Sequence, residues 1–137
     1  MNPYVWKEQN LTGLPQIDSD HQALFRLASQ LQDDIRQGTA WDSLGGHLSR
    51  LISYAGFHFE AEESLMLQTS FPDYNRHRRE HETFTEKLLS LRSVSRHTNN
   101  ELAEALMLFL ANWLEDHTCG SDHRMAEHIK ENMGESA

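Results

Sequence analysis

The stretch LISYAGFHFEAEESLMLQTSFPDYNRHRREHETF, residues 51–84, decides the fold. Apolar residues recur at helical intervals on both sides of Pro72, which cannot lie inside a helix, so two helices with a short connection are predicted. Each helix carries two polar residues four apart: His58 and Glu62 on the first, His77 and His81 on the second. Residues four apart share a helix face. Both pairs therefore continue an apolar face and point toward a common core.

The same helical period covers most of the chain, with no convincing two-residue alternation of the kind that strands show. The predicted helices span about 18–37, 41–67, 74–94, 99 or 100–117, and 122–132. Asp18 is the predicted N-cap of the first helix and Gly38 its stop signal. Long helices with short connections favour an all-α, up-down-up-down antiparallel four-helix bundle.

The chain of 137 residues has the usual size of one domain, so 1–137 is predicted to be a single unit. Its predicted parts are an N-terminal arm (1–17), the four-helix bundle (18–117), and a turn with a short C-terminal helix (118–137). The arm is expected to pack through Trp6, Leu11 and Leu14.

Histidines fall on the apolar face of every predicted bundle helix. His21 shares the first helix's face with Leu24 and Leu31, and His117 shares the fourth's with Leu110 and Trp113. A lone histidine on an apolar face is more often a hydrogen-bonded core residue than a ligand. Five of them with a carboxylate are costly to bury unless all are satisfied together.

A metal cluster would satisfy these groups, because each nitrogen and carboxylate oxygen becomes a ligand. Imidazole and carboxylate suit iron, zinc, manganese or copper better than calcium or magnesium. The five histidines, Glu62 and Asp122 make seven candidate ligands, which are too many for one tetrahedral zinc. Two ions bridged by carboxylates fit this number. Asp122 follows His117 by five residues, and the intervening Gly120 and Ser121 are expected to interrupt the helix and swing Asp122 inward.

Composition limits the partners. Acidic residues outnumber basic ones by 21 to 12, for a net charge of −9, which argues against a nucleic-acid partner. There is no apolar run long enough to span a membrane, and the N-terminus does not resemble a signal peptide. The one cysteine, Cys119, excludes an intrachain disulfide, so a reducing, cytoplasmic location is predicted.

Four segments resemble the haemerythrins, specifically bacterial haemerythrin-like domains, and they occur in family order. They are IDSDHQALF (17–25), HFEAEESLM (58–66), FPDYNRHRREH (71–81) and WLEDHTCGSD (113–122). The combined pattern is highly specific, although each piece alone is weak. The resemblance implies a non-haem di-iron centre, two Fe²⁺/Fe³⁺ ions with an oxo or hydroxo bridge, that binds O2 reversibly.

Carried over to this sequence, the resemblance implies a role for each ligand. His77, His81 and His117 would hold one iron, and His21 and His58 the other. Glu62 and Asp122 would bridge the two ions, and O2 would bind at the second iron, which has one ligand fewer. Trp113, Leu114 and Thr118 match positions in the wall of the O2 pocket.

Other polar residues near the motifs are expected to play no part as ligands. Glu63 and Asp116 should point away from the core, and Glu80 should be a solvated charge. The remaining histidines, expected to be exposed or behind the ligands, are His47, His97, His123 and His128.

Thr118 departs from the family pattern, which usually has an aliphatic residue directly after the fourth-helix histidine. A hydroxyl there could admit water, so the hypothesis is that this protein autoxidises faster than a dedicated oxygen carrier.

The first functional prediction is reversible O2 binding, by a non-enzymatic protein that is a monomer. The alternative is an O2 or redox sensor domain with a covalently linked output domain. A di-iron oxidase or peroxidase is less favoured, because oxygen-activating bundles usually carry more carboxylates.

Overall fold

The computed structural model describes residues 6–37, 44–93 and 100–133. The long helices are α1 (Pro15–Arg36), α2 (Leu44–Gln68), α3 (Tyr74–Ser93), α4 (Asn100–Asp116) and α5 (Asp122–Met133). A short 3-10 helix, Glu8–Asn10, precedes α1, and a π-helical turn, His117–Ser121, joins α4 to α5. The described residues contain no strand, so the all-α prediction is confirmed.

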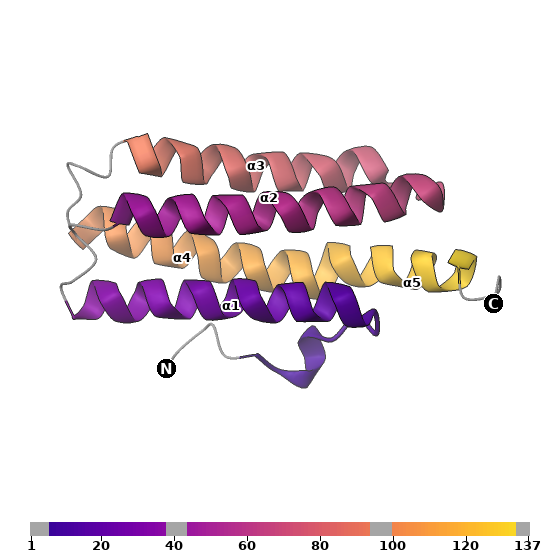
Figure 1. Ribbon diagram of the computed structural model, residues 1–137, viewed down its shortest axis with the longest axis horizontal. Coiled ribbons are helices and arrows are strands. Elements are labelled where there is room, and N and C mark those ends of the chain that lie inside the picture. The colour runs from indigo at the N-terminus through magenta and orange to yellow at the C-terminus, as the bar shows by residue number, and fades with distance from the viewer. Residues whose placement is uncertain (1–5, 38–43, 94–99, 134–137) are drawn as a thin grey trace.

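The first four long helices run alternately in opposite directions, as the colour gradient in Figure 1 shows. α2 packs against both α1 and α3, and α1 also packs against α4. Phe84 of α3 and Trp113 of α4 close the remaining side, with ring centroids 4.4 Å apart. α5 continues the line of α4 beyond the π-helical turn. The predicted up-down-up-down bundle with a C-terminal helix is therefore confirmed.

Two apolar clusters form the interior, and together they set the level at which the polar site lies. The larger cluster includes Leu24, Ala28 and Leu31 of α1, Leu51, Ala55 and Phe59 of α2, Phe84 and Leu88 of α3, and Leu106, Leu110 and Leu114 of α4. The smaller one is made by Ile17, Met66, Phe71, Met125 and Ile129. The predicted ligands lie where the two clusters meet, with His21 between Ile17 and Leu24 on α1 and Glu62 between Phe59 and Met66 on α2. The site is therefore enclosed by apolar side chains from both ends of the bundle.

The start of α1 differs from the prediction, and Asp18 is not its N-cap. The helix begins at Pro15, a favourable first position because proline lacks the N–H that would be unsatisfied there. The Asp18 carboxylate instead reaches back to the arm. It accepts hydrogen bonds from the N–H and hydroxyl of Thr12, both at 2.8 Å, and from the N–H of Gly13 at 3.1 Å. Gly13 has a φ of 88°, a conformation that favours glycine.

The N-terminal arm packs on the bundle through two of the three predicted residues. Trp6 makes an edge-to-face contact with Phe25, with ring centroids 5.2 Å apart. Leu14 packs against the smaller apolar cluster. Leu11 is 45% exposed, so its predicted packing is wrong. The arm turns back at Gly13, which leaves Leu11 on its outer side.

The predicted interruption at Gly120 and Ser121 is also wrong, because the chain stays helical there. The π-helical turn has more residues per turn than an α-helix. A spacing of five residues, from His117 to Asp122, therefore brings both side chains to the same inward face. A widened turn does what a break in the helix was expected to do.

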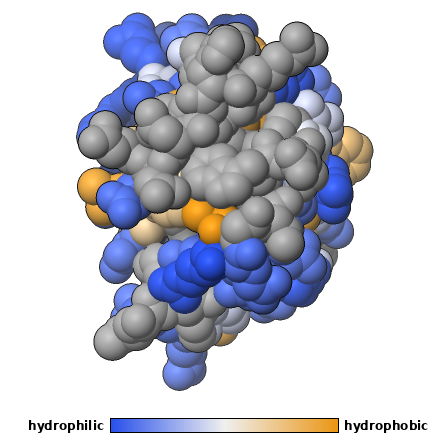
Figure 2. Space-filling view, turned by 90° about the vertical axis from the view of Figure 1, so that its left-hand side faces the viewer, coloured by the Kyte–Doolittle hydropathy of each residue, from blue (hydrophilic) through white to orange (hydrophobic). Residues whose placement is uncertain are grey.

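The predicted stop at Gly38, the helix start at 41 and the helix end at 94 lie outside the described residues, as does His97. None of the described helices is both long and apolar enough to cross a membrane. Figure 2 views the end of the bundle where α1 ends and α2 begins, and its coloured surface is mainly hydrophilic, with apolar side chains in small separate groups.

Asp18→Ala should destabilise the protein by about 1–3 kcal/mol, because it leaves the buried N–H and hydroxyl of Thr12 without an acceptor. Urea unfolding of the purified protein measures the change. Asp33→Asn, an exposed change on the same helix, is the control and should stay within about 0.5 kcal/mol of wild type. Equal unfolding midpoints for Asp18→Ala and the control would contradict this account.

Candidate metal centre

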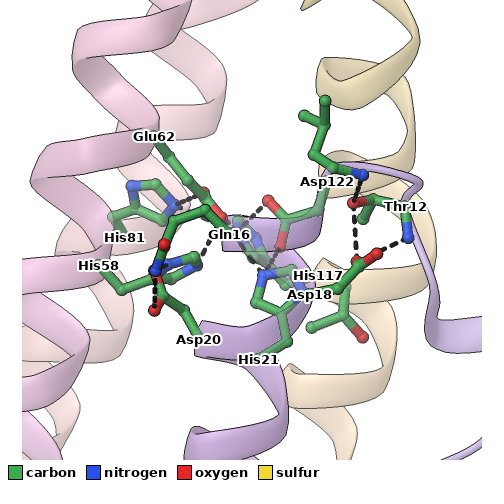
Figure 3. Close-up of polar contacts among 12 residues, drawn as sticks. Thr12, Gln16, Asp18, Asp20, His21, His58, Glu62, His81, His117 and Asp122 are labelled. Carbon is green, nitrogen blue, oxygen red and sulfur yellow. Dashed lines mark hydrogen bonds and ion pairs between the residues drawn. The ribbon is translucent and has the colours of Figure 1, made fainter. Parts of the chain in front are cut away.

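All seven predicted ligands meet in the middle of the bundle, and Figure 3 labels all of them except His77. Each is at most 2% exposed: His21, His58, Glu62, His77, His81, His117 and Asp122. The ligand-type atoms form two overlapping groups that could each hold a metal ion. One contains Glu62, His77, His81, His117 and Asp122, and the other contains His21, His58 and Glu62, with all atoms of a group within 4.8 Å of one another.

Glu62 belongs to both groups because its two oxygens face opposite ways. Oε1 lies 3.1 Å from Nε2 of His77 and 3.0 Å from Nε2 of His81. Oε2 lies 3.3 Å from Nε2 of His21 and 2.6 Å from Nε2 of His58. One carboxylate therefore faces three-histidine and two-histidine sides at once, the arrangement that a bridging ligand requires.

Asp122 is placed in the same way from the start of α5. Its Oδ1 lies 3.0 Å from Nε2 of His77 and 3.1 Å from Nε2 of His117. Its Oδ2 lies 2.9 Å from Nε2 of His21. Glu62 and Asp122 therefore both lie between a group of three imidazoles and a group of two imidazoles.

Several of the converging atoms are oriented as metal ligands would be, and they lack the geometry of hydrogen bonds to one another. Both oxygens of Asp122 and Nε2 of His58 are buried without a well-oriented hydrogen bond, although nitrogen or oxygen atoms lie within about 3 Å. His81 and His117 bring Nε2 to Nε2 at 3.1 Å. Buried polar atoms left like this cost free energy, and ions placed between them would remove that cost. The residues therefore fit a metal pair.

Three further carboxylates lie directly behind ligand rings. The pairs are His58 Nδ1 with Asp20 Oδ2 at 2.9 Å, His81 Nδ1 with Glu63 Oε2 at 3.0 Å, and His117 Nδ1 with Glu80 Oε1 at 2.9 Å. An ionised carboxylate can only accept, so each ring donates from Nδ1 and directs its Nε2 inward. Such partners fix the tautomer and raise the basicity of a ligating imidazole.

The expectation that Glu80 is a solvated charge is therefore wrong. It is half-buried, and the hydroxyl of Ser121 also donates to both its oxygens, at 2.7 and 2.8 Å. Glu63 does point away from the centre, as predicted, but it holds His81 from behind. Asp20, adjacent to His21 in sequence, was not among the predicted site residues. Its position beside a predicted ligand could have indicated a supporting role, but sequence position does not show which ring a carboxylate holds.

The charges at the centre are strongly coupled. Burial alone would lower the pKa of His21, but Asp122 and Glu62 outweigh it and raise this pKa to about 9. In the opposite direction, the surrounding imidazoles lower the pKa of Glu62 and of Asp122 against the effect of burial. Burial would likewise raise the pKa of Glu80, but its bonds to His117 and Ser121 lower it to about 2.

The three residues expected to wall an O2 pocket lie in two different settings. Leu114 and Thr118 are buried, one turn apart on the inner side. The Thr118 hydroxyl donates to the Leu114 carbonyl. The side-chain amide nitrogen of Asn10 lies 3.5 Å from the oxygen of the same hydroxyl. Trp113 instead stacks on His117, with ring centroids 4.3 Å apart, and lines an open cavity.

The remaining described histidines lie apart from the centre. His47 is half-buried and pairs with Asp34 at 2.9 Å. His128 donates to the Thr69 carbonyl at 2.6 Å. His123 is half-buried on α5. Neither group of converging ligand atoms includes any of them.

Comparisons with known proteins point the same way as this geometry. A family model described as "Hemerythrin HHE cation binding domain" matches residues 12–129. A "Myohemerythrin" from Riftia pachyptila is 28% identical over 123 residues, which cover 90% of this chain and 91% of that protein. A "Hemerythrin-like protein" from Naegleria gruberi is 27% identical over 121 residues, covering 88% and 89%. A "Bacteriohemerythrin" from Pseudomonas aeruginosa is 25% identical over 131 residues, covering 96% and 84%.

Asp20→Asn should weaken metal binding about ten- to a hundredfold, because the neutral amide holds the His58 ring less well and lowers its basicity. Competition with a calibrated chelator for Fe²⁺ or Zn²⁺ measures the affinity. Asp33→Asn, an exposed change on the same helix, removes the same charge and should leave the affinity unchanged. If the two variants bound metal equally well, the proposed role of Asp20 would be wrong.

Proposed function

This chain belongs to the haemerythrin family, and from that premise we propose that it binds O2 reversibly at a non-haem di-iron centre. The observation that carries the proposal is the pair of carboxylates, Glu62 and Asp122, that face three histidines on one side and two on the other. A symmetrical ligand set would give each ion the same number of ligands. Here one ion would have an open position.

Each residue would have a definite role at this centre. His77, His81 and His117 would complete the ligands of one iron, so that ion would anchor the cluster. His21 and His58 would hold the other and leave room beside it for O2. Two ferrous ions would each supply one electron when O2 binds and would recover it when O2 leaves. The carboxylates behind three of the rings would hold a proton on Nδ1 and keep Nε2 aimed at the centre.

We propose that Leu114 and Thr118, and not Trp113, wall the O2 site. Both are buried on the inner side of α4 and the turn after it. Leu114 belongs to the larger apolar cluster, which excludes water from one side. Thr118 brings a hydroxyl to the same surface, and the Asn10 amide adds a second polar group.

A binding role is favoured over catalysis by the ligand chemistry. Five imidazoles and two carboxylates make a ligand set richer in nitrogen than the carboxylate-rich sets of oxygen-activating bundles. We expect O2 to be the main partner and the chain to act as a monomer in the cytoplasm. Among the residues that the structure describes, the exposed large apolar side chains are divided between the arm and three helices, which favours the monomer: Leu11, Phe57, Leu67, Leu89 and Leu108.

Metal analysis combined with anaerobic reduction tests this function. We expect two irons per chain, and a charge-transfer band that appears when O2 is admitted to the reduced protein and disappears under argon. Zero or one iron, or a spectrum that O2 does not change, would refute the proposal. Consumption of added peroxide with repeated turnover would favour a peroxidase instead.

Thr118→Ile should lengthen the lifetime of the oxygenated protein several-fold, because it replaces the hydroxyl beside the proposed O2 site with an apolar group. The decay of the oxy absorption band at fixed temperature and pH measures this lifetime. Thr83→Val, an exposed change on α3, should have no effect. Equal lifetimes in wild type and Thr118→Ile would show that the threonine does not promote autoxidation.

A further inference from the structure

An open cavity of about 560 Å³ lies on the outer side of α3 and the π-helical turn. Three arginines line it, Arg76 and Arg79 from α3 and Arg124 from α5, and all three are exposed. Such a cluster stands out on a chain whose net charge is −9. The chain's overall charge repels an acidic protein, so this surface would be the favoured place of contact for one.

The guanidinium groups are largely available to a partner. Within the part of the chain that the structure describes, Arg76 and Arg79 form no ion pair, and Arg124 donates to the Ser121 hydroxyl at 3.2 Å. The lining also contains two acidic residues, Glu80, which is already engaged by His117 and Ser121, and the exposed Asp116, so the arginines outnumber the acidic residues by three to two. Arginine is well suited to carboxylates, because its planar group donates two parallel hydrogen bonds.

The floor of this cavity leads directly to the centre. The Trp113 indole stacks on the His117 ring at 4.3 Å between centroids and 13° between planes. Both rings line the cavity, and His117 points its Nε2 at Asp122. The two stacked rings thus connect the cavity surface with the proposed three-histidine ion.

We propose that this arginine-lined cavity is the docking surface for an acidic protein that donates one electron at a time. The inference rests on the proposed function, since O2 binding requires both ions to be ferrous. A donor with a reduced flavin or iron–sulfur cluster would lose one electron in each encounter. One Fe³⁺ would become Fe²⁺, and two encounters would restore the diferrous state without making or breaking a bond on the donor.

The openness of the site favours a protein over a small anion. The three cationic side chains are spread over two helices around a surface hollow, and they do not close on a common point inside a sealed pocket. Electron-transfer partners bind through small, weak interfaces, and their encounter is steered by opposite charges. A broad positive surface over a ring stack has the properties that such an encounter needs.

Stopped-flow reduction of the diferric protein by reduced flavodoxin, an acidic flavoprotein, tests the proposal. The variant Arg76→Gln/Arg79→Gln should lower the second-order rate constant by about tenfold at low ionic strength, and salt should narrow the difference. The control Arg36→Gln/Arg50→Gln removes the same charge toward the other end of the bundle and should match wild type. Equal rate constants for the two double variants would overturn the proposal.

Binding is measured separately, by titrating ¹⁵N-labelled metal-loaded protein with oxidised flavodoxin and following amide shifts. We expect shifts around 76–80 and 120–124 that the arginine variant loses. Shifts mapped to another face would refute docking here. So would shifts at this face that phosphate or citrate produces and flavodoxin does not, because they would identify a small-anion site.

Chemical reduction with dithionite separates this inference from the proposed function. If dithionite-reduced protein binds O2 but flavodoxin neither binds nor reduces through the arginine surface, only the docking proposal fails. If dithionite-reduced protein loaded with two irons does not bind O2, the proposed function itself fails.

Discussion

The burial of five imidazoles and two carboxylates at one level of the bundle is the constraint that orders the rest of the structure. Larger and smaller apolar clusters close the bundle above and below these groups, so water cannot satisfy them. The free-energy cost of burying these polar groups is removed only when all of them have bonding partners. Each bundle helix must therefore present its polar residues at the same depth and in the same direction.

That requirement explains features which would otherwise look incidental. The π-helical turn at His117–Ser121 brings two residues five apart to one face, where an α-helix would separate them. Asp20, Glu63 and Glu80 use the outer nitrogens of three rings, so the inner nitrogens stay directed at the centre. Each of these three carboxylates is adjacent in sequence to one ligand, but it holds the ring of a ligand from a different segment of the chain.

The two sides of the centre differ in their surroundings. On the proposed O2 side, Leu114 and Thr118 are buried against the arm, where Asn10 reaches Thr118 and Cys119. On the three-histidine side, Trp113 and His117 border a hollow rimmed by arginines. The proposed O2 site and the proposed docking surface would then lie on different faces of the same helical segment.

The sequence by itself determined the helices, the order of their polar residues and the inward direction of the five histidines and Glu62. It could do so because helical period is a local property, and His58 or His81 reveals its face through apolar neighbours three and four residues away. Only the tertiary structure decided that Glu80 holds His117, that Asp18 serves the arm and not the helix start, and that a π-helical turn carries Asp122 inward. Those outcomes depend on which group another segment brings within hydrogen-bond distance, and spacing along one helix does not contain that information.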